Sequence, residues 1–91
     1  MKIFAYVAEF LATLLLISTV YASNGNPLAI GGILSLIITL TGGISGAHVN
    51  PAISFSLYLK GSLKLEDFLG YIGVQFLAGM VALYAFKTLR K

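Results

Sequence analysis

Apolar residues form three long runs along the chain, and short polar or glycine-rich stretches separate them. The runs cover residues 3–22, 27–42 and 65–89, and the first is interrupted mainly by Glu9 and a few hydroxyl side chains. A helix needs about 20 apolar residues to cross a hydrocarbon core of about 30 Å. The pattern therefore predicts three membrane-spanning helices, of which the second is short but adequate.

A fourth apolar run, Ala52 to Leu59, is too short to span and ends at Lys60. Ten helical residues rise only about 15 Å, which is half a membrane. The preceding "GGISGAHV" has too much glycine to continue a helix. A core or interfacial helix would also fit this length, but the run lacks a strong polar face. We therefore expect residues 43–60 to form a re-entrant loop and half-helix, buried in protein or lining a water-filled cavity.

The chain carries the same helix-start signal twice, as Asn26–Pro27 and as Asn50–Pro51. Asparagine caps the first turn with its side-chain oxygen. Proline suits the first helical position because its missing N–H would have no partner there. The two pairs therefore predict the starts of the second long helix and of the half-helix.

Composition places the chain in lipid. It is 58% hydrophobic and 10% charged, whereas an ordinary soluble domain is about 25% charged. The absence of cysteine excludes disulfides and thiolate metal sites, and we expect no cofactor, no metal, no nucleic-acid partner and no enzymatic activity. A cleaved signal peptide is a rival interpretation of the first run, with Lys2 before it and "VYA" as the cleavage site. Glu9 inside the run and the two further apolar runs favour a retained helix.

Three segments resemble one family: "SGAHVNPA" (45–52), "AEFLATLL" (8–15) and "GYIGVQFLAG" (70–79). Together they are similar to the first half of the aquaporin/glycerol-facilitator family, the major intrinsic proteins. The resemblance implies an all-α membrane protein with three transmembrane helices plus one re-entrant half-helix. In that family two inverted halves share one polypeptide and both NPA asparagines face the pore. These 91 residues hold one half and a single NPA motif.

The resemblance implies pore roles for several residues. Asn50, Pro51 and Ala52 form the motif at the tip of the half-helix. The family's filter arginine follows the second NPA, and here Ile53 holds the corresponding place after the first. Ile30 stands where the family's second helix often has an aromatic filter residue. The expected constrictions are therefore apolar, and the expected solutes are water and small neutral molecules such as glycerol.

The resemblance also implies supporting roles. Glu9 and Gln75 are expected to brace the loop that leads to the NPA motif, while direct contact between Glu9 and a substrate is the alternative. For His48 a structural role is expected, with a pH-dependent gate as the alternative. Three glycines are expected to allow close packing of loop and helices: Gly42, Gly43 and Gly46.

Positive charges are shared evenly between the two predicted membrane faces. Three lie on one face and three on the other: Lys2, Lys60 and Lys64 against Lys87, Arg90 and Lys91. Orientation follows the bias of Lys and Arg between short loops, and here that bias is absent. We therefore expect a multi-pass protein, in the cell or cytoplasmic membrane, that inserts both ways and forms an inverted homodimer with one pore. The family's tetramer would correspond to four such dimers.

Two alternatives come from other functional classes. One is a non-conducting protein that pairs with another aquaporin chain. The other is a small dual-topology transporter, in which Glu9 would be the central binding residue because ionisable groups at membrane depth are usually functional.

Overall fold

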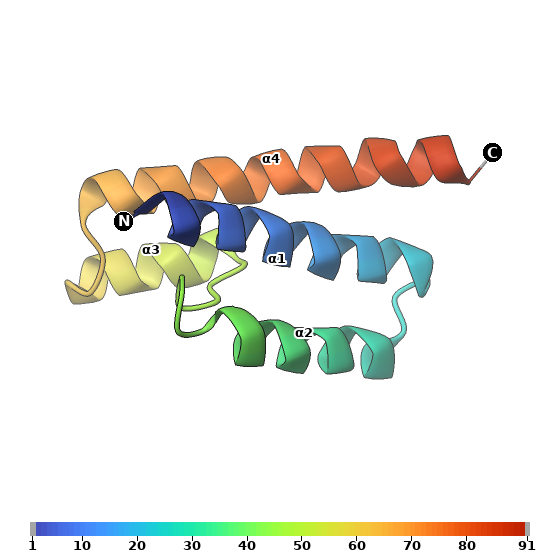
Figure 1. The fold of residues 1–91 in the computed structure, drawn as a ribbon, viewed down its shortest axis with the longest axis horizontal. Coiled ribbons are helices and arrows are strands. Elements are labelled where there is room, and N and C mark those ends of the chain that lie inside the picture. The colour runs from blue at the N-terminus through green and yellow to red at the C-terminus, as the bar shows by residue number, and fades with distance from the viewer. Residues whose placement is uncertain (1, 91) are drawn as a thin grey trace.

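The computed structural model describes residues 2–90; Met1 and Lys91, the latter counted among the charges above, lie outside the described residues. Four helices make up this range: α1 (Lys2–Ala22), α2 (Pro27–Thr41), α3 (Pro51–Lys60) and α4 (Leu65–Leu89). No strand occurs within it, so the predicted all-α architecture is confirmed (Figure 1). By length and composition α1 and α4 can cross a membrane, and α2 is a shorter apolar helix of 15 residues.

Both predicted helix starts are confirmed. Asn26 caps α2, and its Oδ1 accepts from the backbone N–H groups of Leu28 at 2.9 Å and Ala29 at 3.0 Å. Asn50 caps α3, and its Oδ1 accepts from the backbone N–H of Ala52 at 2.8 Å. Each cap satisfies N–H groups that have no partner inside the helix.

Helices α1 and α4 run parallel in a constant register (Figure 1). An ion pair, two aromatic contacts and a hydrogen bond join them, and each links residues 65 or 66 positions apart: Lys2–Asp67, Tyr6–Tyr71, Glu9–Gln75 and Tyr21–Phe86. The buried apolar side chains of these two helices are mostly alanines: Ala5, Ala8, Ala12, Ala78 and Ala82. Small residues let two helix backbones approach closely, which suits packing in lipid.

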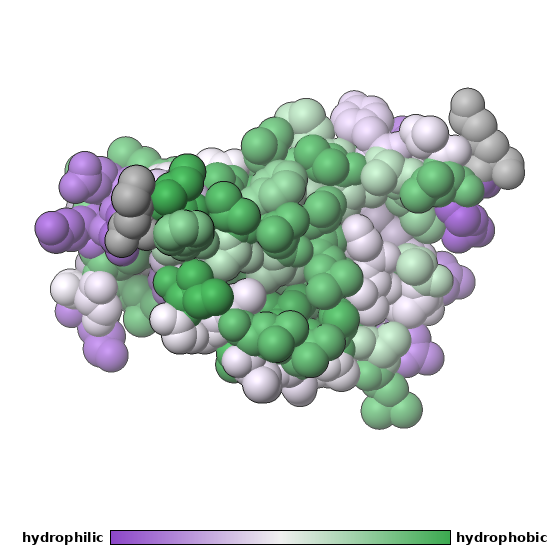
Figure 2. Space-filling view, viewed as in Figure 1, coloured by the Kyte–Doolittle hydropathy of each residue, from purple (hydrophilic) through white to green (hydrophobic). Residues whose placement is uncertain are grey.

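The remaining helices contact fewer neighbours. Helix α2 packs against α1, and α3 packs against α4. A small apolar cluster joins α1, α2 and the loop between α2 and α3 through Ala12, Ile37, Ala47 and Val49. Most large apolar side chains instead face outwards, and Figure 2 shows them as a broad apolar surface between two polar ends. Such a surface suits contact with lipid tails.

The basic residues gather at the two ends of the molecule. Lys2 forms an ion pair with Asp67 in the first turn of α4, at 3.3 Å between Nζ and Oδ2. Lys64 directly precedes α4. Lys87 and Arg90 lie at the opposite end of that helix. The interior between the two ends therefore holds few ionisable groups, and Glu9 is the most deeply buried of them.

Candidate functional site

The loop between α2 and α3 has an unusual backbone. Gly46, Ala47 and Val49 have φ angles of 87°, 51° and 46°. This left-handed region is easy for glycine but costs other residues about 1–2 kcal/mol each, more for a β-branched side chain. Strained residues persist only where their surroundings hold them in place. The loop shape must therefore be maintained by contacts from elsewhere in the chain.

Glu9 supplies most of those contacts. Its side chain is fully buried. Oε2 accepts from Ser45 Oγ at 2.7 Å and from the His48 backbone N–H at 2.9 Å. Oε1 accepts from the Val49 backbone N–H at 2.9 Å and from Gln75 Nε2 at 3.1 Å. A carboxylate can accept four such bonds, so one residue of α1 fixes both the loop and its distance from α4.

Ser54, a residue that sequence reasoning missed, connects three parts of this network. Its Oγ lies 3.1 Å from Gln75 Nε2 and 2.9 Å from His48 Nδ1, and its side chain is fully buried. Ser54 Oγ accepts from Gln75 Nε2, and whether it donates to His48 Nδ1 or accepts from it depends on the tautomer of the imidazole. Ser54 therefore ties α3 to α4 and to the loop, and Gln75 acts through Glu9 and Ser54 and makes no direct bond to the loop.

Tyr71 was also missed. Its hydroxyl donates to the Ser45 carbonyl at 2.8 Å, and its ring lies 4.7 Å from the imidazole of His48 between centroids. The available signal was positional, since Tyr71 precedes Gln75 by four residues and so lies on the same face of α4. Ser54 gave a comparable signal as a polar residue four positions after Asn50.

His48 is packed between the Tyr71 ring, Ser54 and the turn at Gly46, and it is 6% exposed. A Cβ on Gly46 would lie 3.0 Å from His48 Nε2, so close packing is found there. A Cβ on Gly42 would lie 2.6 Å from the Ile38 carbonyl oxygen. The close packing expected at Gly43 is wrong, because no heavy atom lies within 4 Å of a Cβ built on it.

The tip of α3 is the accessible part of the site. Asn50, Ala52 and Ile53 are exposed and Pro51 is half-buried. The Asn50 oxygen serves the helix cap, and its amide N–H₂ has no hydrogen-bond partner among residues 2–90. Ile30 is not brought to this tip. It is half-buried in the first turns of α2, and α2 does not contact α3.

The loop between α2 and α3 also presents free hydrogen-bond acceptors. The N–H groups of Ala47, His48 and Val49 all turn inwards, to Ser45 Oγ and to Glu9. The carbonyl oxygens of residues 46–49 accept no hydrogen bond from the described part of the chain. The site thus combines a row of free carbonyls with one free amide donor. No group of three potential metal ligands occurs within residues 2–90.

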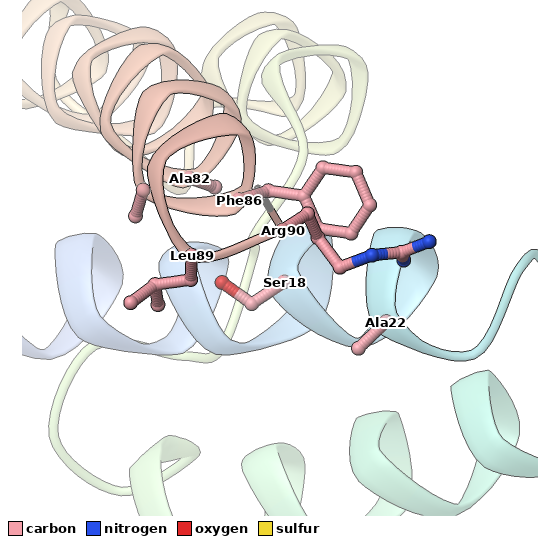
Figure 3. A pocket seen from close by; sticks show the side chains of 7 residues that line it. Ser18, Ala22, Ala82, Phe86, Leu89 and Arg90 are labelled. Atoms are coloured by element: carbon pink, nitrogen blue, oxygen red, sulfur yellow. The ribbon is translucent and has the colours of Figure 1, made fainter.

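A surface pocket of about 290 Å³ lies away from this site, between the last turns of α1 and α4 (Figure 3). Apolar side chains, one hydroxyl and one guanidinium line it: Ser18, Ala22, Ala82, Ala85, Phe86, Leu89 and Arg90. The Arg90 guanidinium carbon is 4.9 Å from the centroid of the Phe86 ring. None of the residues that carry the loop network contributes to this pocket.

Comparison with known proteins decides the family. The profile of the family described as "Major intrinsic protein" matches residues 2–91. This chain is a member of the major intrinsic protein family. It is therefore an integral membrane protein of a family of channels for water and small solutes, which are not enzymes.

Relatives agree with that assignment. The chain is 38% identical over 91 residues to glycerol uptake facilitator protein-like 6 of Lactiplantibacillus plantarum, covering 91% of this chain and 42% of that protein. It is 32% identical over 103 residues to aquaporin PIP2-7 of Arabidopsis thaliana, covering 96% and 37%. It is 36% identical over 91 residues to aquaglyceroporin AqpS of Rhizobium meliloti, covering 84% and 39%. The chain spans about two fifths of these relatives, and no solved structure matches it.

Proposed function

We propose that this chain forms a passive channel for water and small neutral solutes such as glycerol, with each pore enclosed by two copies in opposite orientations. In this arrangement α1, α2 and α4 span the bilayer, and residues 43–60 enter and leave on one side. The observation that carries the proposal is the tip of α3. A ten-residue helix begins there with an exposed asparagine whose amide is free, directly after a loop that Glu9 holds rigid.

The tip favours water over cations. The unsatisfied N–H groups and the aligned dipoles of a helix place roughly half a positive charge at its N-terminus. Two such ends facing each other near the bilayer centre would repel metal cations and protons. The Asn50 amide would donate to a passing water oxygen and orient it. Pro51 removes one surplus N–H, and Ala52 is small enough to let the two tips approach.

The loop would complete the path. Its free carbonyls at residues 46–49 can accept hydrogen bonds from water or from a solute hydroxyl, while Asn50 donates. Passage then requires only the exchange of hydration for these groups, with no covalent step. Ile53 and Ile30 would add apolar walls without a cationic guard, so proton exclusion would depend on the two helix ends.

Charge supports insertion in both orientations. Lys2, Lys60 and Lys64 belong to one end of the molecule, and Lys87 and Arg90 to the other, with Lys91 following them in the sequence. Even counts give the membrane-insertion machinery little preference. By analogy with the family's tetramer, eight chains would surround four pores.

The partial coverage of the relatives favours one alternative, in which this chain pairs with a different chain that supplies the complementary half. In that case this chain alone would not form a conducting pore. A transporter centred on Glu9 has less support, because all four hydrogen bonds of its carboxylate are made within the chain. We therefore retain only the pairing alternative.

Osmotic swelling of liposomes that contain only this purified chain tests the proposal. We expect stopped-flow light scattering to show fast water entry. Asn50→Asp should raise cation leakage, because two carboxylates would offset the positive helix ends. Swelling at the rate of empty liposomes, restored by adding a second family member, would support the pairing alternative.

Orientation is tested separately with a variant of the exposed Ser62, Ser62→Cys, which leaves every Lys and Arg in place, since the wild-type chain has no cysteine. A membrane-impermeant maleimide is applied to intact cells in one sample and to inside-out vesicles in another. Labelling of about half the chains from each side is expected. Labelling from one side only would end the dual-topology proposal.

A further inference from the structure

Two polar atoms are sealed inside the molecule with no partner in the described chain, Thr13 Oγ1 on α1 and Gln75 Oε1 on α4. Thr13 is 3% exposed and Gln75 is 2% exposed. A buried polar atom without a hydrogen bond is costly, so native proteins satisfy nearly all of them with protein groups or ordered water. Two such atoms, one on each of two helices that pack together, therefore point to a ligand.

The orientation of the Gln75 amide is fixed by its neighbours. Its nitrogen lies 3.1 Å from both Glu9 Oε1 and Ser54 Oγ, which gives each of its two hydrogens an acceptor. Turning the amide over would bring its oxygen against the Glu9 carboxylate, where no proton is available. The Gln75 oxygen must therefore face away from Glu9 and needs a donor from elsewhere.

The Thr13 hydroxyl is also turned away from the usual partner. Four other hydroxyls in the helices donate to the carbonyl four residues earlier, at 2.8 or 2.9 Å: Thr19, Ser35, Thr39 and Thr41. That local bond is the common solution for such residues inside a helix. Thr13 does not make it, although it is among the most buried hydroxyl residues of the chain. Its hydroxyl is thus available to a partner other than its own helix.

The register offsets Thr13 from Gln75 by about one helical turn along the bundle, roughly 6 Å of rise. Glu9 contacts Gln75, and Thr13 follows Glu9 by one helical turn. Because α1 and α4 run parallel, the next turn of α4 opposite Thr13 contains Ala78 and Gly79. These residues have the smallest side chains, and Ala78 is fully buried. Between the level of Gln75 and that of Thr13, the facing turn of α4 therefore carries little side-chain bulk.

We propose that a single water molecule binds between Thr13 Oγ1 and Gln75 Oε1. One water hydrogen would be donated to the Gln75 oxygen, and the water oxygen would accept from the Thr13 hydroxyl. Buried waters usually make two to four hydrogen bonds to groups that otherwise lack partners. This water would extend the Glu9–Gln75–Ser54 network by one turn along α1, and its existence does not depend on conduction.

Thermal unfolding of the purified chain in detergent micelles tests the proposal through the direction in which the midpoint temperature changes. Thr13→Val keeps the shape of the side chain and removes the hydroxyl. If the water is bound, the variant strands Gln75 Oε1 and the midpoint falls by about 4–8 °C. Thr13→Ser should stay near the wild type, and the matched control Thr19→Val should change the midpoint less than Thr13→Val. A midpoint for Thr13→Val that is unchanged, raised or equal to that of Thr19→Val would overturn the proposal.

A structure at a resolution that shows ordered water gives the second readout. Density within hydrogen-bond distance of both atoms is expected in the wild type and should be absent in Thr13→Val. A direct bond between Thr13 and Gln75, or a bond from Thr13 to the Glu9 carbonyl, would refute the water site. Liposome swelling can succeed or fail independently of either result, so this test does not share its failure with the channel proposal.

Discussion

The chain starts a helix with Asn–Pro twice, and the two starts are locally alike but differently supported. Asn26 and Asn50 both have extended backbone and both cap their helices through Oδ1. Asn26 follows a turn held by bonds to residues only a few positions away, such as Gly25 N–H to the Val20 carbonyl at 2.9 Å. Asn50 follows a loop held by Glu9, about 40 residues earlier. The same signal thus makes a surface turn in one place and the candidate pore tip in the other.

The difference teaches that the motif supplies the cap and the rest of the chain supplies the site. An Asn–Pro pair fixes where a helix begins because its chemistry is local. It cannot fix where that beginning points. Ser54, Gln75 and Glu9 do so at α3, and α2 has no counterpart to them among the described residues. Substitutions of these supporting residues should therefore affect the start of α3 and leave the start of α2 unchanged.

Glu9→Gln should have the largest effect. The amide replaces one acceptor oxygen with a donor, which would face backbone or side-chain N–H groups that are buried. Loss of charged hydrogen bonds and stranding of their donors should cost roughly 3 kcal/mol or more. Chemical unfolding in detergent measures the loss, with Glu66→Gln in the exposed first turn of α4 as the control. Equal losses in the two variants would contradict the central role of Glu9.

Ser54→Ala should rank second. Its hydroxyl joins Gln75 to His48, so removal leaves two buried groups short of a partner at a cost of about 1–3 kcal/mol. Ser56→Ala on the exposed side of the same helix is the matched control and should be near neutral. His48 is the only histidine of the chain, so its ¹⁵N resonances report the ring directly. The Nδ1 resonance should shift in Ser54→Ala because that nitrogen loses its partner, and an unchanged resonance would contradict the Ser54–His48 bond.

Two of the three left-handed glycines, one before each Asn–Pro pair, sharpen the comparison further. Gly25 and Gly46 have φ angles of 78° and 87°, so alanine at either should cost about 1 kcal/mol in backbone strain. Gly25 has no heavy atom within 4 Å of an added Cβ, whereas Gly46 has His48 Nε2 at 3.0 Å. Gly46→Ala should therefore cost more and slow liposome swelling. If Gly25→Ala proved the more harmful, the packing of His48 against the loop would not be limiting.

Removal of the two capping side chains should give the smallest difference in stability between the two helix starts. Asn26→Ala and Asn50→Ala should each lower stability by about 1 kcal/mol, since each loses one capping side chain. Only Asn50→Ala should change water and cation permeability in liposomes, because only that amide is proposed to meet the solute. Parallel changes in permeability for both variants would show that the second start has no special role.

Local signals predicted much of this molecule. The proline positions and the asparagine caps gave the starts of α2 and α3, and the isolated glutamate in an apolar run marked Glu9 as buried and paired. Apart from the bracing by Glu9 and Gln75 that the family resemblance implied, contacts between distant residues could not be predicted from local signals. Ser54 and Tyr71 have ordinary places in apolar helices, and only the folded chain brings them to His48 and Ser45.

The backbone of the loop was hidden for the same reason. Alanine and valine disfavour left-handed conformations, so no sequence rule would assign one to Ala47 or Val49. Tertiary hydrogen bonds from Glu9 override the local preference there. Gly43 shows the opposite error: a glycine-rich stretch suggested close packing, but the loop leaves that position open. The glycine-rich composition identified the loop, and long-range hydrogen bonds determine its conformation.

Glu9 precedes all four of its donors in the chain, the nearest by 36 residues and the farthest by 66. During synthesis the carboxylate therefore enters the membrane long before anything can neutralise its cost there. Ser45 and the two backbone groups arrive with the loop, and Gln75 arrives only with the last helix. A nascent chain halted before α4 would hold an unfinished loop, so the Glu9 network is complete only once α4 has been made.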